Sequence, residues 1–137
     1  MMARLKRALF LSLLAACTAP PPPPPGAAGP AEAVQEFAEA LRKGDSATAW
    51  SLLSKRTQAQ AEQLAAAARG TSDAGPEAGR QMLFSSALPG RAVQAKAISQ
   101  SGDLAEVQTT EDGGTPRIWH AVREGGRWRL DLDLSAQ

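Results

Sequence analysis

Cross-linking and reactive side chains are scarce in this chain. Its 137 residues include no tyrosine, one cysteine, one histidine and only six aromatic side chains. A lone cysteine cannot form a disulfide within the chain, so the fold must be stable without covalent cross-links. The length allows one domain of ordinary size and excludes two.

Long apolar runs are missing as well. The apolar stretch at residues 8–16 is nine residues long, whereas a helix needs about 20 residues to span a bilayer. It therefore cannot be a transmembrane anchor of ordinary length. Because Arg4, Lys6 and Arg7 precede it, its layout is typical of an export signal, and we expect residues 1–16 to be a signal peptide outside the fold.

An excess of basic charge is the third missing feature. The whole chain has 15 Lys and Arg against 14 Asp and Glu, and removal of residues 1–16 leaves 12 basic side chains against 14 acidic ones. The exported chain therefore carries a formal charge of −2. A net negative charge gives no electrostatic attraction to the phosphates of nucleic acid, so we expect no nucleic-acid partner.

The end of the apolar stretch carries the most specific motif. Leu14-Ala15-Ala16-Cys17 places small residues before a lone cysteine and resembles the lipobox of bacterial lipoproteins. In that family the signal is cut before the cysteine, whose thiol is diacylated and whose new amino group is acylated too. The resemblance implies that Cys17 anchors the chain in a membrane, since several acyl chains give stable attachment. A conventional cleavage after Ala19, which would discard Cys17, is the alternative.

Residues 17–30 are predicted to be a lipidated, proline-rich stalk. Residues 20–25 are all proline, and such a run adopts the extended polyproline form at about 3.1 Å per residue. By the lipoprotein resemblance, Thr18 in place of an acidic residue implies transfer to the outer membrane of a Gram-negative cell. We therefore expect a cell-envelope location, lipid-anchored and facing the periplasm.

Residues 31–137 are predicted to form one domain that begins with helices. The apolar side chains of residues 34–41 recur at the spacing of one buried helical face, and Gly44 ends that helix. Asp45 is a suitable N-cap for a second, short helix, which Ser54 closes.

A third helix is expected to follow directly. Thr57 and Gln60 have the spacing of a capping box, and the helical pattern continues to Gly70. Residues 71–79 have the composition of a loop, and residues 81–88 are predicted to form a fourth, short helix.

Beyond residue 90 the apolar side chains alternate with a period of two. This alternation predicts strands at residues 93–97, 105–109, 117–123 and 127–134. The domain is therefore expected to be α+β, with three or four N-terminal helices packed on a curved, four-stranded antiparallel sheet.

The turns determine the expected register of these strands. The first hairpin needs an odd-length loop around residues 100–102. In the last hairpin a two-residue turn at Gly125-Gly126 places His120 opposite Asp131, whereas a three-residue loop would turn His120 toward the tryptophans. We favour the two-residue turn because it keeps the imidazole beside a carboxylate. The buried face of the hairpin is then expected to hold Trp119, Ala121, Trp128, Leu130 and Leu132.

Two segments resemble the nuclear transport factor 2-like superfamily, also called the cystatin-like cone. They are Trp50-Ser51-Leu52-Leu53-Ser54 after the break at Gly44-Asp45, and the closing hairpin at residues 118–130 with its Gly-Arg-Trp step. The resemblance covers residues 31–134 and implies a cone-like fold more than a function. The superfamily includes ketosteroid isomerases and polyketide cyclases beside many non-catalytic domains. Its enzymes use acids, His or Tyr in a pocket, whereas the inward strand positions here are Val, Ala, Thr, Trp and Leu, so no catalytic site is carried over.

One pair of residues has the chemistry of a catalytic dyad. A carboxylate at Asp131 could orient the imidazole of His120 and raise its basicity. On an outer sheet face the same pair would be a solvated ion pair worth about 0–1 kcal/mol, and we favour that interpretation. Asp131 and Asp133 lack a third ligand, so we expect no metal site and no cofactor.

The scarce aromatic side chains are candidates for lining a ligand cavity. They are Phe37, Trp50, Trp119 and Trp128. Packing in the core is the alternative role for such side chains in a domain this small.

These patterns predict a membrane-anchored lipoprotein of the cell envelope with a non-catalytic binding or scaffolding domain. Its partners would be the membrane, through lipid on Cys17, and a small apolar ligand or an envelope protein. Two alternatives stay open. One is a small-molecule enzyme of the ketosteroid isomerase-like type that uses His120 and Asp131. The other is an oligomerising assembly module, a homodimer with Ile118 and Val122 at its interface.

Overall fold

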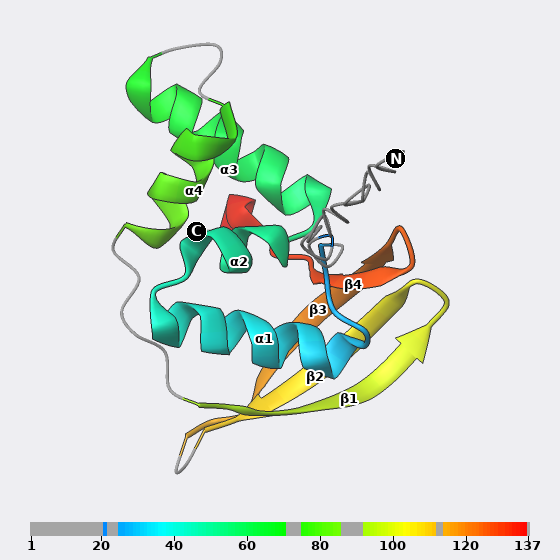
Figure 1. Ribbon diagram of the computed structural model, residues 1–137. Coiled ribbons are helices and arrows are strands. Elements are labelled where there is room, and N and C mark those ends of the chain that lie inside the picture. Colours follow the sequence, from blue (N-terminus) through cyan, green and yellow to red (C-terminus); the bar gives the residue numbers. More distant parts are fainter. Residues whose placement is uncertain (1–20, 22–24, 71–74, 86–91, 112–113, 137) are drawn as a thin grey trace, which may run out of the picture.

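The structure is a computed structural model that describes residues 21, 25–70, 75–85, 92–111 and 114–136 (Figure 1). The predicted signal peptide, Cys17 and most of the proline run lie outside these residues.

The described residues form an α+β domain in which helices precede an antiparallel sheet, as predicted (Figure 1). The helices are α1 (Pro30–Lys43), α2 (Ser46–Ser51), α3 (Lys55–Arg69) and α4 (Gly75–Phe84). The strands are β1 (Gln94–Ser101), β2 (Leu104–Thr110), β3 (Arg117–Glu124) and β4 (Arg127–Leu130), followed by the short 3-10 helix η1 (Leu134–Ala136).

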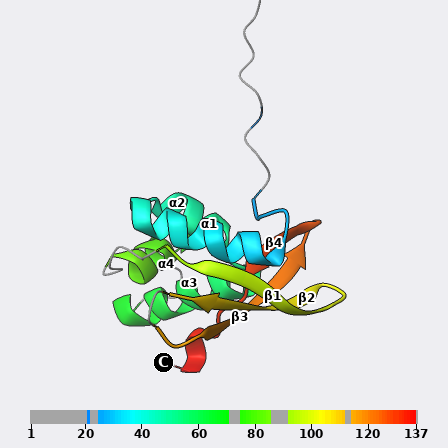
Figure 2. The ribbon, with the colours of Figure 1, turned by 90° about the horizontal axis from the view of Figure 1, so that it is seen from below.

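Helix α1 covers one face of the sheet, and α3 and α4 pack on each other beside it (Figure 1 and Figure 2). Its buried stripe includes Val34 and Phe37, at the predicted spacing. Gly44 ends the helix in the left-handed conformation, with φ 70°, also as predicted. The predicted helix thus supplies the main cover for the apolar sheet face.

The caps of α2 and α3 differ in part from the prediction. Asp45 caps α2, because its carboxylate accepts a hydrogen bond of 3.0 Å from the Thr48 N–H. Ser54 does not close α2. It is the N-cap of α3, and its Oγ accepts from the Thr57 N–H at 3.1 Å. The predicted capping box of Thr57 and Gln60 is therefore wrong by one turn, since Thr57 already lies inside the helix.

Helix α4 begins earlier than predicted, at Gly75, so the expected loop at residues 71–79 is wrong over its described part. Pro76 lies in the first turn, where its missing N–H costs no hydrogen bond. Gly79 allows α4 to approach its neighbours, because a Cβ there would lie 3.0 Å from the Trp50 ring. The helix ends at Phe84, short of the predicted end at residue 88.

The sheet has the order β1-β2-β3-β4 and is antiparallel throughout. In the first hairpin Ala97 lies opposite Val107, as the odd-to-odd register requires. The register then shifts at Ile98, the extra residue of a β-bulge, so that Ser101 lies opposite Leu104 across a two-residue turn. The predicted odd-length loop is therefore wrong. The extra residue that this register requires lies inside β1, at the bulge, and not in the loop.

The last hairpin has the predicted two-residue turn at Gly125-Gly126, with Glu124 opposite Arg127. Strand β4 ends at Leu130 and does not reach the predicted residue 134. The Asp131 N–H still donates to the His120 carbonyl of β3, and beyond it the backbone groups of Leu132 pair with a side chain of α3. The Leu132 N–H donates to Thr57 Oγ1 at 2.8 Å, and the Thr57 hydroxyl donates to the Leu132 carbonyl at 3.0 Å.

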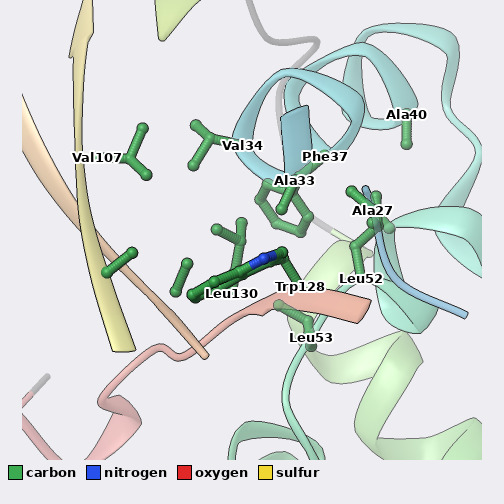
Figure 3. Close-up of a cluster of buried hydrophobic side chains, with 13 residues drawn as sticks. Ala27, Ala33, Val34, Phe37, Ala40, Leu52, Leu53, Val107, Trp128 and Leu130 are labelled. Atoms are coloured by element: carbon green, nitrogen blue, oxygen red, sulfur yellow. The ribbon is translucent and has the colours of Figure 1, made fainter. Parts of the chain in front are cut away.

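The core lies between α1, the segment after α2, and the sheet (Figure 3). Trp128 and Leu130 point into it from β4, and Ala121 is buried beside them, as predicted. Trp119 and Leu132 are half-buried and pack at its margin, so these two are less enclosed than expected. Ala27, which the composition assigned to the stalk, is fully buried, so the folded domain includes residues before 31.

Candidate functional site

His120 lies on the sheet face that points away from α1. Its neighbour Ala121 is buried, and the alternation of the strand leaves the His120 side chain exposed. The imidazole lines an open groove of about 450 Å³, together with Leu104, Glu106 and Asp131. His120 and Asp131 are therefore near each other, but in a shallow groove and not between the helices and the sheet.

The carboxylate of Asp131 is engaged by residues at the start of α3. It accepts hydrogen bonds from Ser54 Oγ at 2.7 Å, from Arg56 Nε at 3.1 Å and from Arg56 Nη2 at 2.9 Å. Partial burial raises the pKa of Asp131, but the hydrogen bonds from Arg56 and Ser54 outweigh it and hold the pKa below its usual value. This carboxylate stays charged at neutral pH.

No hydrogen bond joins the His120 and Asp131 side chains in the described structure. The two residues are linked only through their backbones, where the Asp131 N–H donates to the His120 carbonyl at 2.9 Å. Orientation of an imidazole by a carboxylate requires a side-chain hydrogen bond. The geometry therefore places the predicted pair together without assembling a dyad.

A second carboxylate of the hairpin also contacts the beginning of α3. Glu124 accepts from the Lys55 N–H at 3.1 Å, and its other neighbour is Arg129, whose Nη1 lies 3.8 Å away. Carboxylates at a helix N-terminus satisfy free N–H groups and complement the helix dipole. Glu124 and Asp131 together attach α3 to the last hairpin. Sequence reasoning missed this role, because both acids lie more than 60 residues after the start of α3 in the sequence.

A partly open aromatic cavity lies elsewhere, between α1 and the sheet, and the charged residues Glu111 and Arg117 are also in its lining. It has a volume of about 160 Å³, and Phe37, Leu41 and Trp119 are among its lining residues. The Phe37 and Trp119 rings have centroids 6.3 Å apart, and Trp119 Nε1 donates to Thr109 Oγ1 at 2.9 Å. This hydrogen bond fixes the indole at the wall of the cavity. Two of the four predicted pocket residues therefore do line one cavity.

The other two predicted pocket residues have packing roles. Trp128 is buried in the core beneath α1 (Figure 3). Trp50 packs against Gly79 of α4, and its carbonyl accepts from the Gln58 side chain at 2.8 Å. Neither lines the cavity of Phe37 and Trp119.

The outer sheet face also carries exposed apolar side chains. Leu104 is 62% exposed and Ile118 is 50% exposed, while Val122, opposite Leu104, is half-buried. Leu104 and Val122 are direct neighbours across β2 and β3, whereas Ile118 lies four positions before Val122 on β3, opposite Gln108. The three side chains share one face and form an apolar patch that His120 interrupts.

The acidic residues near the C-terminus do not gather into a metal site. Asp133 accepts a hydrogen bond from the Ser135 N–H at 3.0 Å, and its bonds to Ser135 lower its pKa. Nowhere in the described ranges do three His, Cys, Asp or Glu side chains converge as metal ligands. Among the described helices, each is too short or too polar to cross a bilayer.

Family models, curated proteins and solved structures compared with this chain give no match. The resemblance to the nuclear transport factor 2-like superfamily therefore stays a prediction. The function has to be inferred from the geometry of the groove at His120, the aromatic cavity and the apolar patch.

Proposed function

We propose that this protein is a lipid-anchored binding module of the cell envelope, with a cone-like domain that holds a small apolar ligand between α1 and the sheet. The observation that carries the ligand site is the cavity of about 160 Å³ at Phe37 and Trp119. A cavity of this order is large enough for a benzene-sized molecule, and most of its lining residues are apolar. The order of helices before a bent sheet supports the cone-like assignment.

The hydrogen bonds that Asp131 already makes favour a binding function over a catalytic one. A catalytic dyad needs the carboxylate free to orient His120, whereas Arg56 and Ser54 already hold it. His120 also lies on the opposite side of the sheet from the aromatic cavity, so the only imidazole cannot act on a ligand there.

The ligand site can be tested with benzene as the probe. We expect benzene to shift the indole N–H resonance of Trp119, because this group lies in the cavity wall. Ala38 also lines the cavity, so Ala38→Leu should fill it and reduce the shift at least five-fold. Ala67→Leu makes the same change at an exposed position of α3 and should leave the shift intact. A shift that persists in Ala38→Leu would place the benzene elsewhere.

The anchor is tested separately by mass spectrometry of the mature protein. We expect an acylated N-terminus at Cys17 and membrane association that Cys17→Ser abolishes. Conventional cleavage would instead give an unmodified N-terminus at Pro20. That result would remove the anchor without affecting the ligand site.

The exposed apolar patch supports a second candidate function, self-association through the outer sheet face. We expect sedimentation to show a concentration-dependent dimer, which Ile118→Thr should weaken at least ten-fold while keeping a β-branched residue in the strand. Thr115→Ala, outside the strands, is the control. A monomer at all concentrations would exclude this candidate.

A further inference from the structure

The outer edge of β4 is covered by two segments that are not strands. Leu130 donates its N–H to the Leu52 carbonyl at 2.7 Å, and its own carbonyl accepts from the Ser54 N–H at 2.7 Å. Two positions earlier in β4, the Ala27 N–H donates to the Trp128 carbonyl at 2.8 Å, and the Trp128 N–H donates to the Ala27 carbonyl at 2.9 Å. Both edge-facing residues of β4 are therefore fully paired.

The residues around Ala27, here called the strap (residues 25–29), are fitted to this edge. Ala27 is 0% exposed and belongs to the same buried cluster as Leu52 and Trp128 (Figure 3). Arg127 Nη2 donates to the Gly26 carbonyl at 2.9 Å, which adds a third hydrogen bond to the strap.

Gly26 is the position that lets the strap approach so closely. Its φ is +100°, a conformation that residues other than glycine rarely adopt. A Cβ there would lie 2.8 Å from the Arg127 Cβ and 3.0 Å from the Trp128 carbonyl oxygen. The strap therefore fits β4 because this residue has no side chain.

We propose that the strap is a lock that joins the N-terminal tether to the sheet and keeps the β4 edge closed. An uncovered strand edge exposes unpaired N–H and C=O groups, and here the edge residue is the core tryptophan. The bridge is the first pairing between the tether and the sheet in the described residues, and its release would expose the backbone N–H and carbonyl of Trp128.

The lock rests on the proposed function in one respect: a lipid on Cys17 would attach the tether to a membrane, which could then pull on it. The bridge itself requires no lipid. The experiment therefore uses the full chain carrying Cys17→Ser, so that a failure of lipidation cannot be mistaken for a failure of the strap.

Hydrogen exchange at the Trp128 amide measures the bridge directly. Ala27→Pro removes the N–H that donates to the Trp128 carbonyl and keeps the carbonyl that accepts from the Trp128 N–H. Because the bridge is a single residue pair, loss of one hydrogen bond should loosen the other, so we expect the Trp128 amide to exchange at least ten-fold faster. Gly26→Ala keeps every donor but places a Cβ against Arg127, and the same acceleration is expected from it. Ala28→Pro is the matched control, because Ala28 is exposed and should leave the exchange rate within two-fold.

Two results would overturn the lock. One is a Trp128 exchange rate within two-fold of the parent chain in both Ala27→Pro and Gly26→Ala. The other is an equal acceleration in Ala28→Pro, which would mean that proline near the helix start, and not loss of the bridge, is responsible. If Ala27→Pro does not fold, Gly26→Ala decides the question.

Discussion

The hydroxyl of Thr57 takes the place of a strand where β4 ends. Thr57 is 0% exposed, and its single hydroxyl pairs with both the N–H and the carbonyl of Leu132, at 2.8 and 3.0 Å. Thr57→Val keeps the shape of the side chain but removes both hydrogen bonds. A buried polar group without a partner costs about 1–3 kcal/mol. Because Leu132 is half-buried and water reaches it in part, we expect a total loss of about 2 kcal/mol.

The loss can be measured by thermal and urea unfolding followed by tryptophan fluorescence. A loss of about 2 kcal/mol corresponds to a fall in Tm of roughly 10 °C for a domain of this size. Thr57→Ser retains the hydroxyl and loses one buried methyl group, so it should cost only about 1 kcal/mol. Thr110→Val, at an exposed strand position, should be close to neutral.

The order of these variants tests the reasoning. If Thr57→Val is as stable as the parent chain, or more stable than Thr57→Ser, the hydroxyl does not substitute for a strand partner.

Two further predictions concern the attachment of the helices. The lowered pKa of Asp131 means that folding favours its charged form. The charged carboxylate therefore stabilises the fold at a pH above its unfolded pKa of about 3.9. This stabilisation is lost as the pH falls through the lower pKa of the folded state. The urea midpoint of Asp131→Asn should therefore lie below that of the parent chain at pH 6, and the difference should shrink toward pH 3; a constant difference would contradict the contact with Arg56. Gly79→Ala would gain about 1 kcal/mol of helix propensity in an open helix. Here the new Cβ meets Trp50 at 3.0 Å, so we expect a lower Tm from overpacking, and an increase would show that α4 shifts freely.

Local patterns were sufficient to predict most of the elements. The apolar spacing of α1, the cap at Asp45 and the Gly125-Gly126 turn are confirmed, because each depends on residues close in the chain. The bulge at Ile98 has no local signal, since it adds one residue without changing the composition of the strand. The register before the bulge was nevertheless correct, because the buried face determines it.

The incorrect predictions concern positions where residues far apart in the sequence come into contact. Strand β4 alternates apolar and polar residues to position 134, yet it ends at Leu130, and beyond it Leu132 pairs with the hydroxyl of Thr57 in α3. Ser54 and Arg56 hold the Asp131 carboxylate, which makes no hydrogen bond to His120 in the described structure. Ala27 was assigned to the stalk because it lies in a segment rich in proline and glycine. Its pairing with Trp128 of β4 joins residues far apart in the sequence, so no local pattern indicates it.

The bulge at Ile98 has a consequence for the behaviour of the protein at high concentration. Strand β1 is the other edge of the sheet, and no described segment covers it as the strap covers β4. An even, flat edge of eight residues would be a template for end-to-end growth of sheets into insoluble fibres. The extra residue twists this edge and the charge of Lys96 resists the approach of a second β1, so both features disfavour edge-to-edge pairing of two copies.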